Sequence, residues 1–206
     1  MNRALASEIA FLSLEHLWLV FVSVAVAIAI AVPAGVLATR RAGMRRWTAG
    51  LVNIVQTVPS LALFGFLLPL PFVGGIGKRT AIIALILYGL LPILRNTLVG
   101  ILGVDRAVRD SAIAMGMTGR QLLWRVELPL AFPSILAGIR IATVATIGTA
   151  TIAAAIGAGG LGTFIFRGIA MVDTRTVLAG AVPSAAMALI ADEVLAWFER
   201  RVSASL

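Results

Sequence analysis

The sequence has no cysteine, one histidine and one lysine, and only 13% of its 206 residues are charged. The lack of cysteine excludes disulfides, thiolate nucleophiles and cysteine-ligated metals, and the single histidine, His16, excludes a multi-histidine metal site in one copy. A soluble domain of this length carries about twice as much charge. Because 60% of the residues are hydrophobic and the mean hydropathy is +1.04, the composition predicts a single integral membrane bundle over residues 1–206.

Acidic residues are also scarce, with 9 Asp and Glu against 17 Lys and Arg and a net charge of +8. In membrane proteins Lys and Arg collect in cytoplasmic loops, so this excess indicates membrane topology and not a nucleic-acid partner. We expect His16, at the start of the first apolar run, to be an interfacial residue.

Long apolar runs predict an all-α fold with about five transmembrane helices. The predicted spans are 17–38, 51–70, 80–94, 131–156 and 177–198. Residues 1–16 predict a short interfacial lead-in, and residues 158–176 predict an outer loop. Pro59 interrupts the second span, and the backbone carbonyl that it frees should face protein or a watery cavity. The first run exceeds the apolar core of a signal peptide, about 7–15 residues, which disfavours that alternative.

Basic residues assign the two sides of the membrane. Arginines cluster between residues 40 and 46, directly after the first span, and others follow the third and fifth spans on the same side. By the positive-inside rule this side is cytoplasmic, which places the N-terminus outside and the C-terminus inside. Trp18, Trp47 and Trp197 fall at predicted span ends, as in an aromatic belt.

The one long polar segment between spans runs from Asp105 to Pro129 and predicts two short amphipathic helices. Asp105 is a favourable N-cap, and Gly116 supplies the left-handed position that ends a helix. Thr118 begins the second helix, Gln121 completes a capping box, and Pro129 stops continuation on that axis. The apolar stripes of the two helices are formed by Val108, Ala112, Met115, Leu122, Leu123 and Val126. Such helices in water are typical of a surface that a partner binds.

Two glycine-rich stretches resemble nucleotide-binding motifs in their residues, but each lacks a feature that nucleotide binding requires. The run GAGGLG at 157–162 follows a membrane span and has no strand–turn–helix unit around it, so a tight turn is predicted. The run GGIGKRT around Lys78 has Phe72 where a phosphate loop needs its first glycine and Arg79 where it needs Ser or Thr. Since Lys78 is the only lysine, no P-loop is possible, and an ATPase would have to be another polypeptide.

Charges within the spans are the other candidate functional groups. Asp192 and Glu193 lie in the inner third of the fifth span, and Arg140 lies in the inner part of the fourth. In a self-contained ion-coupled carrier, the two acids would be the coupling site. The simpler interpretation is interfacial snorkelling or pairing with an arginine near the inner surface. A non-transporting scaffold that recruits a soluble partner is a third alternative.

The polar segment also resembles the cytoplasmic coupling loop of ABC importer permeases. The family pattern is Glu-Ala-Ala, three residues, Gly, nine residues, Ile, one residue and Leu-Pro, and every spacing fits. Asp, Ser and Val replace the Glu, the first Ala and the Ile. The candidate ATPase-coupling residues are the matching positions and Met115 of the apolar stripe: Asp110, Ser111, Ala112, Met115, Gly116, Val126, Leu128 and Pro129.

The resemblance extends over residues 17–201. Residues 56–63, 87–97 and 156–162 are similar to permeases of osmoprotectant importers, which take up quaternary amines such as glycine betaine, choline or carnitine. Relatives that import methionine and other amino acids share the coupling loop, so an amino-acid permease is the alternative. The resemblance implies a multi-pass, type I ABC importer permease with a cytoplasmic two-helix coupling loop, in the plasma (inner) membrane of a bacterium.

The resemblance further implies partners: a second permease, identical or a sister chain, a cytoplasmic ABC ATPase, and an external solute-binding protein. ATP and Mg would be bound by the ATPase, with no catalytic residue, metal or cofactor on this chain. The predicted polar translocation path consists of Gln56, Thr57, Ser60 and Tyr88. Aromatic faces bind quaternary ammonium groups. The further wall candidates, for which core or lipid packing is the simpler interpretation, are Phe64, Phe66, Phe164 and Phe166.

Overall fold

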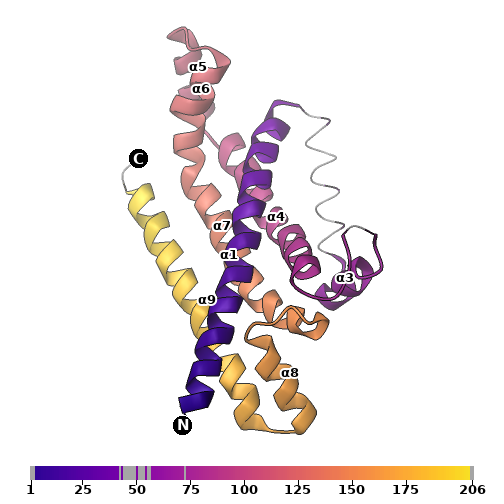
Figure 1. The fold of residues 1–206 in the computed structure, drawn as a ribbon. Helices are drawn as coiled ribbons and strands as arrows, with labels where there is room; N and C mark the ends of the chain where they lie inside the picture. Colours follow the sequence, from indigo (N-terminus) through magenta and orange to yellow (C-terminus); the bar gives the residue numbers. More distant parts are fainter. Residues whose placement is uncertain are drawn as a thin grey trace.

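The computed structural model describes residues 3–41, 43, 50, 54, 57–71 and 73–204, which form helices and connecting turns without strands (Figure 1). Four helices within these ranges are long and apolar enough to cross a membrane. They are α1 (Arg3–Arg40), α4 (Lys78–Leu102), α7 (Leu128–Ala153) and α9 (Thr174–Ser203). The predicted all-α integral membrane fold is therefore confirmed.

Shorter helices occupy the two ends of the bundle. Helices α5 (Arg106–Ala114) and α6 (Gly119–Leu122) lie at one end, and α8 (Gly162–Met171) lies at the other, near the N-terminus of α1 (Figure 1). Helix α3 (Ser60–Leu67) lies against α4. The remaining elements are the π-helical turn η1 (Leu123–Glu127) and the 3₁₀ turn η2 (Ala154–Ile156), which precede and follow α7.

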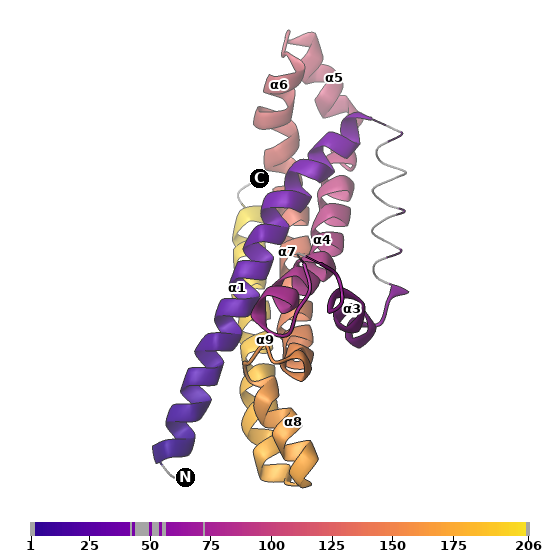
Figure 2. The same cartoon turned by 45° about the vertical axis from the view of Figure 1, so that its right-hand side comes forward.

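Helix α7 is the centre of the bundle, because it packs against α1, α4 and α9, whereas α1 and α9 have little contact with each other (Figure 2). Small residues let α7 approach α4 closely. Gly138 on α7 faces Asn96 and Pro92, and Gly100 on α4 faces Ser134. Lipid is as apolar as a side chain, so helices in a membrane associate through such close packing and not through the hydrophobic effect.

Two clusters of buried apolar side chains fill the bundle along α1, α4 and α7. The cluster nearer η2 also includes α3 and is built around Phe64 and Leu85. The cluster nearer α5 contains Ala27, Ala31 and Ala142, whose small side chains keep the three helices close together.

Helix α1 begins earlier than the sequence predicted. Residues 3–16, which were predicted to be an interfacial lead-in, belong to this helix, and Leu12 packs against Leu161 and Phe164. His16 is not the plain interfacial residue that was predicted, since its side chain is fully buried in the bundle and its Nε2 lies 3.1 Å from the carbonyl oxygen of Ile147. Buried polar groups require such partners, and this one is distant in the sequence.

The predicted interruption of the second span is confirmed at Pro59. Residues 51–53, 55 and 56 lie outside the described residues, but Pro59 has extended backbone (φ −56°, ψ 140°) directly before α3. Beside the break, the carbonyl oxygen of Val58 accepts a hydrogen bond from the hydroxyl of Tyr88 on α4. The irregular backbone thus faces protein, where its polar groups find partners.

Helix α4 continues past the predicted end of the third span at residue 94 as far as Leu102. The amide of Asn96 donates to the carbonyl oxygen of Pro92 over 2.9 Å, and the hydroxyl of Thr97 donates to that of Ile93 over 2.8 Å. Side chains that bond back to the preceding turn remain compatible with a membrane helix, so these polar residues do not end it.

Helix α8 was missed, because residues 158–176 were predicted to be a loop. Its contact with α9 is close: a Cβ added at Gly180 would lie 2.4 Å from the carbonyl oxygen of Leu161. Asp173 then caps α9. The Thr176 hydroxyl and the Arg175 amide donate to its carboxylate, and these hydrogen bonds hold the pKa of Asp173 below its ordinary value.

We predict that Gly138→Ala destabilises the protein by about 1–3 kcal/mol, because the new Cβ would overlap atoms that the chain cannot move freely. That Cβ would lie 2.6 Å from the Cβ of Asn96 and 2.8 Å from the carbonyl oxygen of Pro92. The matched control is Gly148→Ala on the same helix, where no atom lies within 4 Å of the added Cβ. Thermal unfolding of the two purified variants in detergent measures the difference, and equal melting temperatures would contradict the packing argument.

Candidate functional site

Helices α5 and α6 stand beyond the end of the bundle, and their local structure follows the sequence closely. The carboxylate of Asp105 caps α5 by accepting a hydrogen bond from the amide of Ala107 over 2.9 Å. Gly116 has φ +80°, and the amide of Met117 donates to the carbonyl of Ala112, which closes a Schellman turn. Thr118 and Gln121 form a reciprocal capping box at α6. The predicted caps and the left-handed glycine are therefore confirmed.

The residues of the coupling motif differ widely in exposure. Ala112 is buried, with 2% of its surface exposed, whereas Met115 is 72% exposed. Asp110 is also exposed, and its carboxylate lies 3.7 Å from Arg106 on the same helix. A surface pair of this kind contributes little to stability and leaves Asp110 accessible. Of the other motif residues, Ser111 and Gly116 are exposed, and Val126, Leu128 and Pro129 are partly buried.

An apolar groove of about 330 Å³ runs between α5 and the start of the long helix. Its walls contain the whole predicted apolar stripe of the first short helix and the motif residue Val126. The lining residues are Ala107, Val108, Ser111, Ala112, Met115, Met117 and Val126. Because several of these apolar side chains remain exposed at the end of the bundle, the groove has the character of a surface that a partner covers.

The prediction that Pro129 ends a second short helix is wrong. Helix α6, the turn η1 and helix α7 form one continuous helical run, with Pro129 in the first turn of α7. The amide of Leu128 bonds to the carbonyl of Leu123, five residues earlier. The wider π-helical turn directly before Pro129 accommodates the proline without ending the run.

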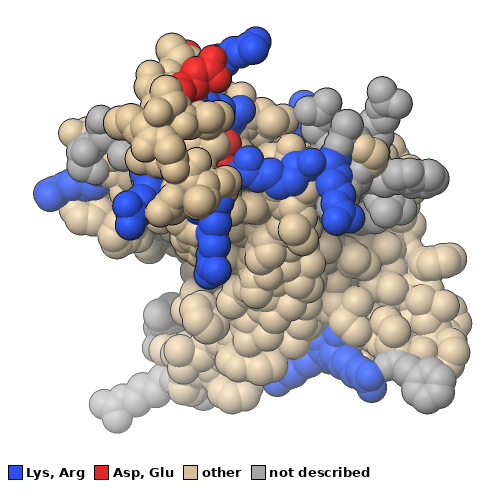
Figure 3. All heavy atoms as spheres, turned by 90° about the horizontal axis from the view of Figure 1, so that it is seen from above, with Lys and Arg blue, Asp and Glu red and all other residues tan. Residues whose placement is uncertain are grey.

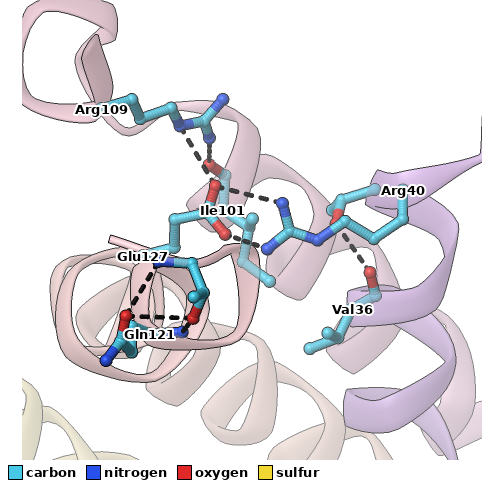
Figure 4. Close-up of polar contacts among 8 residues, drawn as sticks. Val36, Arg40, Ile101, Arg109, Gln121 and Glu127 are labelled. Atoms are coloured by element: carbon cyan, nitrogen blue, oxygen red, sulfur yellow. Dashed lines mark hydrogen bonds and ion pairs between the residues drawn. The ribbon is translucent and has the colours of Figure 1, made fainter. Parts of the chain in front are cut away.

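Glu127 is a candidate that the sequence analysis missed. Its side chain is buried beneath α5, between Arg40 at the end of α1 and Arg109 on α5 (Figure 4). Arg40 forms an ion pair with the carboxylate, and Nε of Arg109 lies 3.4 Å from Oε1. Glu127 occupies the one position between Val126 and Leu128 that the family pattern leaves open, so the motif carried no signal for it.

The predicted translocation-path residues are brought together only in part. Gln56 lies outside the described residues. The Thr57 side chain is exposed and its hydroxyl donates to the carbonyl of Ile54, while Ser60 is partly buried at the start of α3. Tyr88 reaches across from α4 to the break at Pro59. Among the aromatic wall candidates, Phe64 and Phe164 are fully buried core residues, whereas Phe66 and Phe166 are exposed.

The charges within the last two spans pair with one another. Nε of Arg140 lies 3.5 Å from Asp192, and its Nη1 lies 3.5 Å from Glu199, so α7 and α9 are linked by ion pairs. Glu193 lies 3.8 Å from Arg200. The simpler interpretation of these acids, pairing with an arginine, is therefore confirmed. Within the described residues there is also no group of three His, Cys, Asp or Glu residues that could hold a metal ion.

At the opposite end, the glycine-rich sequence after α7 forms the predicted tight turn. Gly157, Gly159 and Gly160 all have left-handed backbone, with φ values of 74°, 82° and 75°. The amide of Gly160 donates to Oε2 of Glu15 over 2.7 Å, and Nζ of Lys78 lies 2.6 Å from Oε1. The turn therefore binds a carboxylate from α1 of the same chain.

Basic side chains gather at the end of the molecule that carries α5. Seen from that end, basic side chains stand out from the surface in several groups with few acidic residues beside them (Figure 3). The exposed arginines of this half include Arg41, Arg95, Arg106, Arg120 and Arg125.

A bundle of membrane-crossing helices that presents a capped helical pair beyond one end has the architecture of a transport permease. Residues 11–204 match the family described as binding-protein-dependent transport system inner membrane component, and the chain belongs to this family. It is thus an inner-membrane protein. In importers of this family the ATPase is a separate subunit, so the chain is not itself an enzyme.

Similar permeases come from several bacteria. The glycine betaine/carnitine/choline transport system permease protein OpuCB of Bacillus subtilis is 46% identical over 95% of this chain and 89% of its own. The carnitine transport permease protein OpuCB of Listeria monocytogenes is 44% identical over 92% and 85%. The osmoprotectant import permease protein OsmY of Salmonella typhimurium is 41% identical over 98% and 85%.

Solved structures share the fold. An inward-facing MetNI methionine ABC transporter matches with a TM-score of 0.88 and 24% identity, covering 98% of this chain and 99% of that one. An amino acid ABC transporter crystallised with histidines matches with a TM-score of 0.81 and 18% identity, over 95% and 94%. At these identities the likeness shows the fold alone, which is that of type I importer permeases.

We predict that Gly116→Val destabilises the turn between α5 and α6 by about 1–2 kcal/mol, since a branched side chain is disfavoured in left-handed backbone. No atom lies within 4 Å of an added Cβ, so the effect is conformational and not steric. Hydrogen exchange of the peptide over residues 112–118 should accelerate accordingly. Gly116→Asn is the control, because asparagine tolerates this conformation, and an equal acceleration in both variants would contradict the prediction.

Proposed function

We propose that the chain is the membrane-spanning subunit of an ATP-driven importer for a quaternary-amine osmoprotectant such as glycine betaine, choline or carnitine. The observation that most directly supports this proposal is the similarity to three permeases that are named for these solutes or for osmoprotectants. They are 41–46% identical to this chain over 92–98% of its length. The structural neighbours named for amino acids are 18–24% identical and support only the shared fold.

The proposed importer contains a second permease, a cytoplasmic ATPase that binds ATP and Mg, and an external solute-binding protein. The ATPase docks on α5, at the groove that contains Ala112 and Met115. This docking is supported by the exposed apolar residues of the groove, by the accessible carboxylate of Asp110 and by the match to the coupling-loop pattern. ATP-driven closure of the ATPase would displace α5, and the bundle would switch access from one side of the membrane to the other.

The end with α5 is proposed to face the cytoplasm, with the N-terminus on the outer side. The N-terminus lies at the opposite end of the bundle from α5, and the C-terminus lies toward the end with α5 (Figure 1). The exposed arginines around α5 support this orientation through the positive-inside rule.

The solute path is proposed to run beside the break at Pro59, where Gln56, Thr57, Ser60 and Tyr88 are candidate lining residues. The partly buried Tyr88 supports this placement, because an aromatic ring can face a quaternary ammonium group, which has no hydrogen-bond donors. Its hydroxyl is already used by the backbone at Val58, so the ring and not the hydroxyl would contact the solute.

We predict that proteoliposomes containing the permease, its ATPase and its binding protein accumulate radiolabelled choline or glycine betaine only when ATP is supplied. Omission of either partner should abolish uptake, because the chain provides neither ATP hydrolysis nor solute capture. Uptake of methionine instead would support an amino-acid permease. Uptake by the chain alone, driven by an ion gradient, would contradict the proposal.

A second prediction concerns docking and orientation. Since the natural chain has no cysteine, Met115→Cys introduces a unique thiol, and Met115 is exposed on α5. A bifunctional thiol–amine reagent should crosslink this variant to the ATPase in native membranes. The matched control is Ile76→Cys, which is 87% exposed in the loop at the opposite end. It should react with a membrane-impermeant thiol reagent added outside and should not capture the ATPase; the reverse pattern would overturn the orientation.

A further inference from the structure

Glu127 lies at the junction of several helices. Among the side chains that the structure describes, it is the only Asp, Glu, Lys or Arg that is almost completely buried, with 2% of its surface exposed. Removing a carboxylate from water is costly unless cations and hydrogen-bond donors replace the water. Here two arginines surround it, one from each side (Figure 4). Replacing buried ion pairs by apolar residues is often neutral or stabilising, so the cluster of Glu127 with the two arginines is not explained by stability alone.

Helix α5 has few other attachments to the bundle. Of its nine residues, Ala112 is the only buried one, Arg109 the only partly buried one, and the others are exposed. Ala112 contributes a single methyl group. Arg109 instead contacts two separate elements: its Nε lies 3.4 Å from Oε1 of Glu127, and its Nη2 donates to the carbonyl of Ile101 near the end of α4. The polar link of α5 to the bundle therefore runs through this guanidinium.

The other side of the carboxylate is held by α1. Nη1 of Arg40 lies 3.5 Å from Oε1 of Glu127, and Nη2 donates to Oε2. A guanidinium that meets both oxygens of a carboxylate fixes orientation as well as distance. Glu127 is itself the last residue of η1 and is continuous with α7. The three side chains thus connect α1, α4, α5 and α7 at one point.

We propose that Glu127 is a positioning residue, which with Arg109 and Arg40 fixes α5 to the ends of α1, α4 and α7 so that these helices move when α5 is displaced. This inference rests on the proposed function, since it assumes that an ATPase moves α5. Without the link, α5 would still bind the ATPase through its groove, but its displacement would be taken up by the turns on either side of α5 and would not reach the long helices.

The test uses the complete importer in proteoliposomes, with solute uptake and ATP hydrolysis measured together. Glu127→Gln preserves the size of the side chain and removes its charge. It should still assemble with the ATPase and hydrolyse ATP, but the solute transported per ATP should fall by about 2- to 30-fold, the range expected for loss of a coupling contact. Arg109→Gln should produce the same fall. Because the Arg109 side chain is 24% exposed, its substitution should disturb folding less than a change at Glu127.

Two comparisons separate positioning from general stability. The double variant Glu127→Gln/Arg109→Gln should lose less coupling than the sum of the two single variants, because both substitutions remove the same contact between Glu127 and Arg109. Arg140→Gln removes a different interhelical pair, to Asp192 and Glu199 between α7 and α9. It should lower thermal stability and leave the ratio of transport to hydrolysis as in the natural chain.

An unchanged ratio in both single variants would overturn the proposal. So would additive losses in the double variant, an equal fall in Arg140→Gln, or failure of both single variants to assemble, which would make the cluster a folding requirement. Each of these variants is compared with an unsubstituted importer that transports the solute in the same assay. Failure of the proposed function would instead appear in the unsubstituted importer, as absent ATP-driven uptake and no capture of the ATPase by Met115→Cys.

Discussion

A backbone polar group in hydrocarbon has no water to bond, and this constraint explains the irregular parts of the bundle. The break at Pro59 places the carbonyl of Val58 against the hydroxyl of Tyr88, and the turn after α7 directs the amide of Gly160 to Glu15. The ring of His16, buried in the bundle, also has a backbone partner, since its Nε2 lies 3.1 Å from the carbonyl oxygen of Ile147. At the break before α3 and at the turn after α7, a polar side chain from another helix therefore bonds to the irregular backbone.

Features that depend on neighbouring residues could be predicted from the sequence. The left-handed Gly116, the capping box of Thr118 and the cap at Asp105 involve groups only two to five residues apart, so their chemistry is visible in a short window. The same is true of the break at Pro59 and of the tight glycine turn after α7. The motif spacing in the segment from Asp110 to Pro129 was enough to indicate the family.

Features that depend on distant partners could not be predicted. Glu127 is paired with Arg40, 87 residues away, and His16 with Ile147, 131 residues away, so neither is revealed by local pattern. Two local effects were also not predicted. Pro129 was predicted to stop a helix, but the π-helical turn directly before it continues into α7. The other is Asn96, which does not end α4 because its side-chain amide bonds to the carbonyl of Pro92 in the preceding turn.

The unbroken helical run through α6, η1, α7 and η2 has a consequence of scale. It extends from Gly119 to Ile156, 38 residues, and at about 1.5 Å per residue it is roughly 57 Å long. The hydrocarbon layer is only about 30 Å thick. The run is therefore longer than the hydrocarbon layer is thick, and its first turns, against which α5 packs, need not lie within the lipid. A soluble protein could then approach α5 from water.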